Sequence, residues 1–126
     1  MRYSKITPVF SGCEEIRMGS SFQICELDLK GRWTPNLPNY DWQNIYAQSD
    51  NKRYLALVAW DTENNEPGFK IIIIDSKNKS MSETKRINGC CESIEWSATG
   101  FTYRTYSYLS ENDFSDSLIL IPNQAV

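Results

Sequence analysis

The side chains that most often perform acid–base catalysis or bind metals are absent or scattered in this sequence. None of the 126 residues is histidine, which removes the commonest general base and the commonest metal ligand. The four cysteines do not have the spacing of a zinc site, and the six glycines form no phosphate-binding loop. We therefore expect no bound metal, no cofactor and no enzymatic activity.

Carboxylates at strand ends are the remaining route to catalysis. A pair drawn from Asp28, Asp75, Glu92 and Glu95 would have the residue types of a glycosidase site. A carboxylate in such a place more often accepts hydrogen bonds from nearby backbone amides and forms the turn. We favour that structural role and keep a carboxylate-based hydrolase or sugar-binding domain as an alternative.

Two acidic segments form the first candidate surface for binding another protein. Residues 54–69 and 105–126 each contain three carboxylates and neither lysine nor arginine. They take equivalent places in an internal repeat, so we expect them to emerge on one edge of the molecule and to attract a basic partner. This predicted acidic edge consists of Asp61, Glu63, Glu66, Glu111, Asp113 and Asp116. Two ordinary solvated loops are the alternative interpretation.

An aromatic segment forms the second candidate surface. Residues 33–42 contain Trp33, Tyr40 and Trp42, and tryptophan and tyrosine are the residues that most often anchor protein interfaces. Alternatively, these rings cover an open end of the hydrophobic core.

The elements that must position these residues repeat along the chain. The pattern F-x-I-x-x-L-D at residues 22–28 returns as F-x-I-x-x-I-D at residues 69–75, and a weaker copy occupies residues 116–121. A polar turn that leads into a strand, residues 49–57, returns at residues 97–105. The offsets of 47 and 48 residues predict one β domain over residues 1–126, with repeats at about 22–68 and 69–122.

The composition favours strands, because aromatic and β-branched residues suit a pleated surface. We predict an all-β fold, an antiparallel meander of about nine strands. The predicted strands are residues 3–10, 21–29, 43–48, 53–61, 68–75, 82–87, 92–96, 101–109 and 117–121. Residues 54–60 and 71–74 are apolar on both faces, which predicts central strands covered on both sides. Residues 31–41 are predicted to form a long loop. The predicted core comprises Leu55, Leu57, Ile71, Ile73, Ile94, Trp96 and Leu120.

The repeat resembles the blades of a β-propeller, in which a W-S-x-D-G turn often precedes a strand. Residues 96–100 match that turn, with Thr99 where aspartate is usual, and residues 49–52 match it more loosely. Residues 73–79 are similar to the strand and polar turn that follow. About two and a half repeats are too few to close a propeller of roughly four to eight blades. The resemblance therefore implies open blade-like sheets or a β-sandwich, and it implies no particular function.

The cysteines have two interpretations. The adjacent Cys90 and Cys91 are poorly placed to bond to each other. We expect all four to be reduced thiols in or near the core, and a disulfide such as Cys13–Cys25 is the alternative.

Charge and general character complete the functional prediction. The net charge of −3 argues against a nucleic-acid partner, and no apolar run is long enough to span a membrane. We expect a cytoplasmic protein, similar in general character to the small immunity proteins with which bacteria neutralise toxins. It would cover the active site of a basic toxin such as a nuclease. The alternative is a structural or assembly module that pairs through exposed strand edges, with self-association as one form of it.

Overall fold

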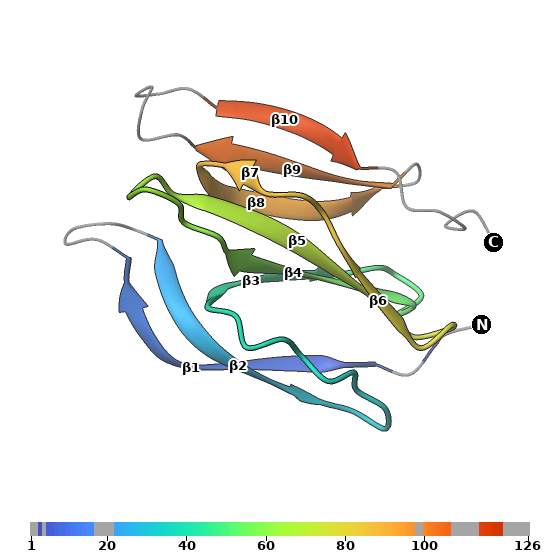
Figure 1. Ribbon diagram of the computed structural model, residues 1–126. Coiled ribbons are helices and arrows are strands. Elements are labelled where there is room, and N and C mark those ends of the chain that lie inside the picture. The colour runs from blue at the N-terminus through green and yellow to red at the C-terminus, as the bar shows by residue number, and fades with distance from the viewer. Residues whose placement is uncertain (1–2, 4, 17–21, 98–99, 107–113, 120–126) are drawn as a thin grey trace.

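The computed structural model describes residues 3, 5–16, 22–97, 100–106 and 114–119, which form antiparallel β-strands (Figure 1). The strands are β1 Thr7–Glu15, β2 Gln23–Lys30, β3 Trp42–Gln48, β4 Tyr54–Trp60, β5 Gly68–Asp75, β6 Ser80–Glu83, β7 Ile87–Asn88, β8 Cys90–Ser97, β9 Gly100–Tyr106 and β10 Phe114–Ile119. This part of the chain contains no helix, and so none that could cross a membrane. The predicted all-β meander is confirmed.

The strands form two sheets. The larger has the order β1-β2-β3-β4-β5-β6, with β7 also paired to β5, and the smaller has the order β10-β9-β8. The predicted strand at residues 82–87 is divided into β6 and β7. At the division, the hydroxyl of Thr84 accepts a hydrogen bond from the Ile71 amide at 3.0 Å, and the Thr84 amide donates to the Ile71 carbonyl at 3.0 Å. Residues 31–41 contain no strand, as predicted.

The β4–β5 hairpin is buried on both of its faces. Every residue of β4 is buried, and β5 is buried except at Lys70 and Asp75, which are half-buried. Successive side chains of a strand point to opposite faces, so the hairpin contributes to two separate clusters. One cluster contains Leu55, Leu57, Ala59, Ile72 and Ile74, and the other contains Tyr54, Ala56, Val58, Ile71 and Ile73. The prediction of central strands covered on both sides is confirmed.

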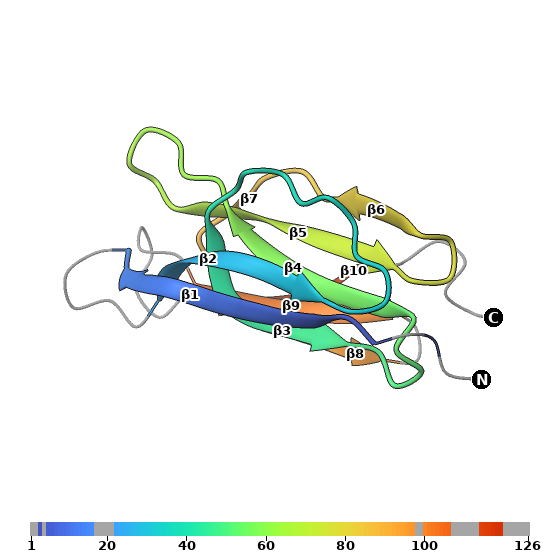
Figure 2. The ribbon, with the colours of Figure 1, turned by 90° about the horizontal axis from the view of Figure 1, so that it is seen from below.

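A separate layer covers each face of the hairpin. In Figure 1, β8–β10 lie on one side of β3–β5, and β1 and β2 lie on the other. Toward β8, the ring of Trp96 stacks on Tyr54 with centroids 5.3 Å apart, and its Nε1 donates to the carbonyl of Ala47. Toward β1 and β2, Leu29 and Ile6 join the first cluster, together with side chains from residues 31–41. Figure 2 shows those residues as the connection that arches from β2 to β3.

Most of the predicted core is confirmed. Leu55, Leu57, Ile71 and Ile73 are at most 5% exposed. Ile94 and Trp96 are only partly buried, although both pack against the second cluster. They belong to the covering sheet rather than to the central hairpin, which explains their greater exposure. Leu120 lies outside the described residues.

A buried ion pair joins the two strands at the open end of the central hairpin. Arg53 donates from Nε and from Nη2 to the two carboxylate oxygens of Asp75, at 3.0 and 3.1 Å. The two side chains are 3% and 13% exposed. Burial by itself raises the pKa of Asp75, but hydrogen bonds from Arg53 and from the amides of Asn78 and Lys77 outweigh it and leave that pKa below its ordinary value.

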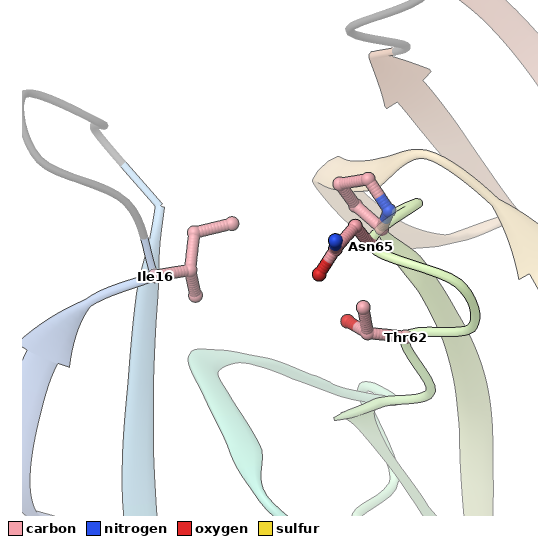
Figure 3. Close-up of a pocket in the computed structure, with 4 residues that line it drawn as sticks. Ile16, Thr62 and Asn65 are labelled. Carbon is pink, nitrogen blue, oxygen red and sulfur yellow. The ribbon is translucent and has the colours of Figure 1, made fainter.

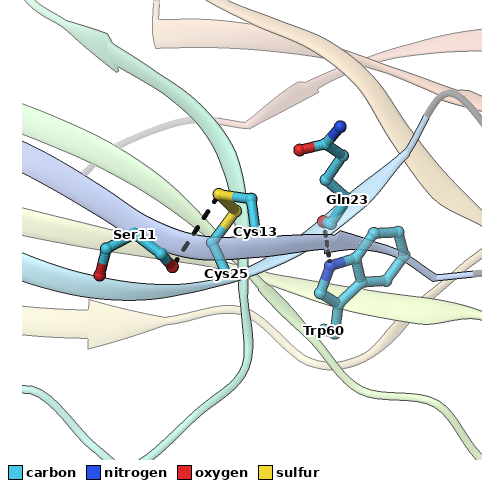
Figure 4. Close-up of a disulfide and its surroundings, with 5 residues drawn as sticks. All are labelled: Ser11, Cys13, Gln23, Cys25 and Trp60. Carbon is cyan, nitrogen blue, oxygen red and sulfur yellow. Dashed lines mark hydrogen bonds between the residues drawn. A yellow bond between two sulfur atoms is a disulfide. The ribbon is translucent and has the colours of Figure 1, made fainter.

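A disulfide joins Cys13 of β1 to Cys25 of β2 (Figure 4), which corrects our expectation that all four cysteines are reduced. The pairing of β1 with β2 shifts by one residue between Ser11 and Glu14, where Gly12 adopts a positive φ of 59°. This bulge brings Cys13 opposite Cys25. An inserted residue of this kind leaves no periodic signal in the sequence. Cys90 and Cys91 are buried cysteines outside any disulfide, as expected, and burial raises the pKa of Cys91 to about 12.

Substitutions on the two faces of β5 test whether both covering layers exclude water. Ile72→Ala and Ile73→Ala should each lower the free energy of unfolding by roughly 2–5 kcal/mol, because each removes methyl groups from a different buried cluster. The matched control is Val9→Ala at a side chain 43% exposed, with an expected change below about 0.5 kcal/mol. Denaturant unfolding followed by tryptophan fluorescence measures all three. A negligible change for Ile72→Ala would show that β1 and β2 leave that face open.

Asp75→Ala tests the buried ion pair. It should lower the free energy of unfolding near neutral pH by about 3–5 kcal/mol, because Arg53 keeps its charge and loses its partner. A lowered carboxyl pKa contributes stability that is fully present above the unfolded value of about 3.9 and is lost as the pH falls through the folded-state pKa. The difference in the free energy of unfolding between wild type and variant should therefore become smaller below about pH 4. Asp28→Ala, at a side chain 68% exposed, is the control and should behave as wild type. If this difference in the free energy of unfolding stayed constant with pH, the conclusion that Arg53 stabilises the charged form of Asp75 would be wrong.

Candidate functional site

Three residues of the predicted acidic edge lie at the turn between β4 and β5. Asn64 and Asn65 both have positive φ, 51° and 63°, which is the backbone of a tight two-residue hairpin turn that asparagine tolerates well. The backbones of Glu63 and Glu66 exchange two hydrogen bonds across this turn, at 3.1 and 2.8 Å. Residues 62–66 are exposed. We call residues 61–67 the acidic hairpin.

Arg86 holds the acidic hairpin from the side of β7. Its guanidinium donates to the carbonyls of Asp61 and Glu66 at 2.7 and 2.9 Å, and also to the side chain of Asn88. It lies 3.5 Å from the carboxylate of Glu63. These contacts fix the hairpin at three points and place one positive charge behind its carboxylates.

The sequence prediction missed this compensating charge. Residues 54–69 contain no basic residue, but Lys70 lies 3.8 Å from the carboxylate of Asp61, and Arg86 returns to the hairpin from the next connection. Strand pairing brings these charges together across a sequence gap. The absence of a side chain at Gly68 makes space for Arg86, because a Cβ atom at position 68 would lie 2.5 Å from the Arg86 guanidinium. A glycine at the start of a strand, facing a later arginine, is the only sequence signal of the contact.

A cleft adjoins the acidic hairpin. It has a volume of about 450 Å³ and is lined by Ile16, Thr62, Asn65 and Pro67. Figure 3 shows Ile16 at the end of β1 facing Thr62 and Asn65 across the opening. The indole of Trp60 donates to the carbonyl of Gln23 at 2.8 Å and joins β4 to β2 (Figure 4).

The other half of the predicted acidic edge is not brought to the hairpin by any described contact. Glu111 and Asp113 lie outside the described residues. Asp116 lies in β10, where its backbone is paired with Arg104 of β9. A single edge that carries all six carboxylates stays a prediction.

The aromatic segment packs mainly inward. Trp42 is 3% exposed, and Trp33 and Tyr40 are half-buried. All three pack with the cluster that contains Leu55 and Ile72, on the β1–β2 side of the β4–β5 hairpin. The hydroxyl of Tyr40 donates to Glu83 of β6 at 3.1 Å, and Lys70 lies 5.8 Å from its ring centroid. Burial and the bond to Glu83 raise the pKa of Tyr40. This arrangement agrees with the alternative that the rings cover the core, and it leaves one edge of Tyr40 at the surface.

The carboxylates considered for catalysis lie in unrelated places. Asp75 is held by Arg53, and Asp28 forms an exposed pair with Lys30 at 3.0 Å. Glu92 and Glu95 are exposed on β8. Glu95 lines a shallow groove of about 300 Å³ that also includes Ser93, Thr102 and Arg104. Within the described ranges, no three potential metal ligands cluster.

Comparisons of the chain with protein-family models, with curated proteins and with solved structures find no match.

Arg86→Ala tests the support of the acidic hairpin. Amide hydrogen exchange at Glu63 and Glu66 should become about tenfold faster or more, since one hydrogen bond from a charged group contributes about 1.5–3 kcal/mol. Gly68→Ala should have a similar effect, because the new methyl group displaces the guanidinium. Lys85→Ala, at an exposed neighbour, should leave the exchange unchanged. Equal amide hydrogen exchange in wild type and Arg86→Ala would mean that the turn is stable without the contacts of Arg86.

Proposed function

We propose that this chain is a non-enzymatic protein-binding domain of the immunity type, which neutralises a basic toxin, such as a nuclease, by covering its active site. The observation that carries the proposal is the acidic hairpin, in which Glu63 and Glu66 face each other across a tight turn. Like charges placed directly opposite on paired strands destabilise the free protein. Arg86 offsets part of this repulsion on the side of Glu63, and a basic partner would relieve the remainder.

The support of the hairpin favours the same conclusion. Arg86 contacts Glu63 and the backbone from one side, while the Glu63 side chain stays 64% exposed. The backbone that carries the carboxylates is thus held in position before any partner arrives, which reduces the ordering cost of binding. The excess of 16 acidic over 13 basic residues has the sign that would steer a basic partner toward the domain.

The outer edges of the larger sheet give less support to assembly by strand pairing. β1 carries Pro8 and the bulge at Gly12, and β6 has only four residues. Proline, bulges and short strands are the devices that keep a sheet edge from pairing with another chain. We therefore favour docking through side chains over pairing of sheet edges between copies.

We propose the cytoplasm as the location. Thiols are kept reduced there, so the proposal requires a fold that survives without the bond between Cys13 and Cys25. The packing of Trp60 and Phe22 would hold β2 in place in that case.

Charge reversal at the hairpin tests the proposal. The chain is used to capture a partner, and the association rate is then measured with Glu63→Lys/Glu66→Lys. The double variant should associate at least about tenfold more slowly at low salt, and the difference should shrink as salt screens the charges. Glu92→Lys/Glu95→Lys makes the same change of charge on β8 and should associate at nearly the wild-type rate.

The captured protein must itself meet two conditions. It should be basic, and its activity should be inhibited by the wild-type chain in proportion to the complex formed. An acidic partner, or unchanged association by the hairpin variant at low salt, would refute the proposal.

A further inference from the structure

One edge of β2 lacks a strand partner along most of its length. β2 pairs with β1 from Gln23 to Lys30, but it pairs with β3 only where Cys25 faces Trp42. The connection between β2 and β3, residues 31–41, forms no strand. Within the described residues, the second edge of β2 therefore has no strand partner from Glu26 onward.

Hydrogen bonding indicates which backbone groups face this edge. The amide of Leu29 donates to the side chain of Asp28 at 2.9 Å. Its partner in the register is Pro8, which has no amide hydrogen to give. Leu29 therefore directs its backbone groups away from β1, and the two-residue period of a strand directs those of Leu27 the same way.

A groove of about 430 Å³ runs along this open edge. Its lining includes Glu26, Leu27 and Asp28 of β2, with Ser11 of β1 beside Glu26, and the segment from Leu37 to Tyr40. The volume lies within the range of about 300–1,000 Å³ typical of ligand sites.

The side chains around the groove have complementary properties. The buried Trp42 also lines it, and Tyr40 is held in place by its bond to Glu83. Glu26 is exposed and makes no described ion pair, whereas the neighbouring Asp28 is paired with Lys30. The groove thus combines an apolar wall, backbone groups without a strand partner, and one negative charge not offset by a described cation.

We propose that this groove receives a short extended segment of the protein partner, which adds a strand to the open edge of β2 and places a lysine or arginine against Glu26. Main-chain hydrogen bonds would supply affinity, and the position of the basic side chain would supply specificity. The proposal deepens the proposed function and rests on it only in assigning the segment to that partner.

The test uses an acetylated and amidated pentapeptide of alternating valine and arginine as the probe. Titration into the full chain, followed by amide resonances, should shift residues 26–28 and 39–42 in a saturable way at millimolar concentration and leave residues 63–66 unchanged. A copy of the peptide with methylated backbone nitrogens should not bind, because it cannot donate to the strand edge. Glu26→Gln should weaken binding by about two- to fivefold, as for one exposed charge pair. Glu14→Gln, on β1, is the matched control and should not change it.

Two results would overturn the inference. One is the absence of saturable shifts at residues 26–28, and the other is equal binding by the methylated peptide. Neither depends on the acidic hairpin. If Glu63→Lys/Glu66→Lys abolishes partner binding and the peptide does not bind in the groove, the proposed function stands and this inference fails.

Discussion

The apolar character of both faces of the β4–β5 hairpin is the constraint on which the rest of this structure depends. A hairpin with only one apolar face can leave the other in water, whereas this one must be covered twice. The chain meets that requirement with strands that precede the hairpin on one side and strands that follow it on the other. The hairpin's turn is the acidic hairpin, so the candidate binding surface is anchored directly in the best-packed part of the molecule.

Opposite charges secure the hairpin at both of its ends, with different consequences. At the open end, Arg53 and Asp75 are nearly withdrawn from water, and their contact serves stability. At the turn, Arg86 contacts carbonyls and Glu63, which stays in water. An exposed carboxylate can exchange one cation for another at little cost. The same kind of pair therefore fixes the fold at one end and leaves the surface available at the other.

The sequence was sufficient to predict the central strands, because runs such as Ile71 to Ile74 are apolar on both faces and end in turn residues. It also indicated the inward-facing aromatic segment, although only as an alternative. The contact of Arg86 with the hairpin was not predicted, and the bond between Cys13 and Cys25 was indicated only as an alternative. Neither could be derived from the residue pattern. The first depends on the break between β6 and β7, and the second depends on a one-residue bulge. Both are changes of strand register, and the periodicity of the side chains in the sequence does not indicate where such changes occur.

The close approach of Gly68 and Arg86 has an evolutionary consequence. The guanidinium occupies the space that any larger residue at position 68 would need, so position 68 cannot accept a larger residue while Arg86 stays in place. Among descendants of a common ancestor, an alanine or serine at position 68 should be accompanied by a shorter side chain at position 86. Such lineages would need another way to brace the turn, and a change in its length or charge should appear together with the paired replacement.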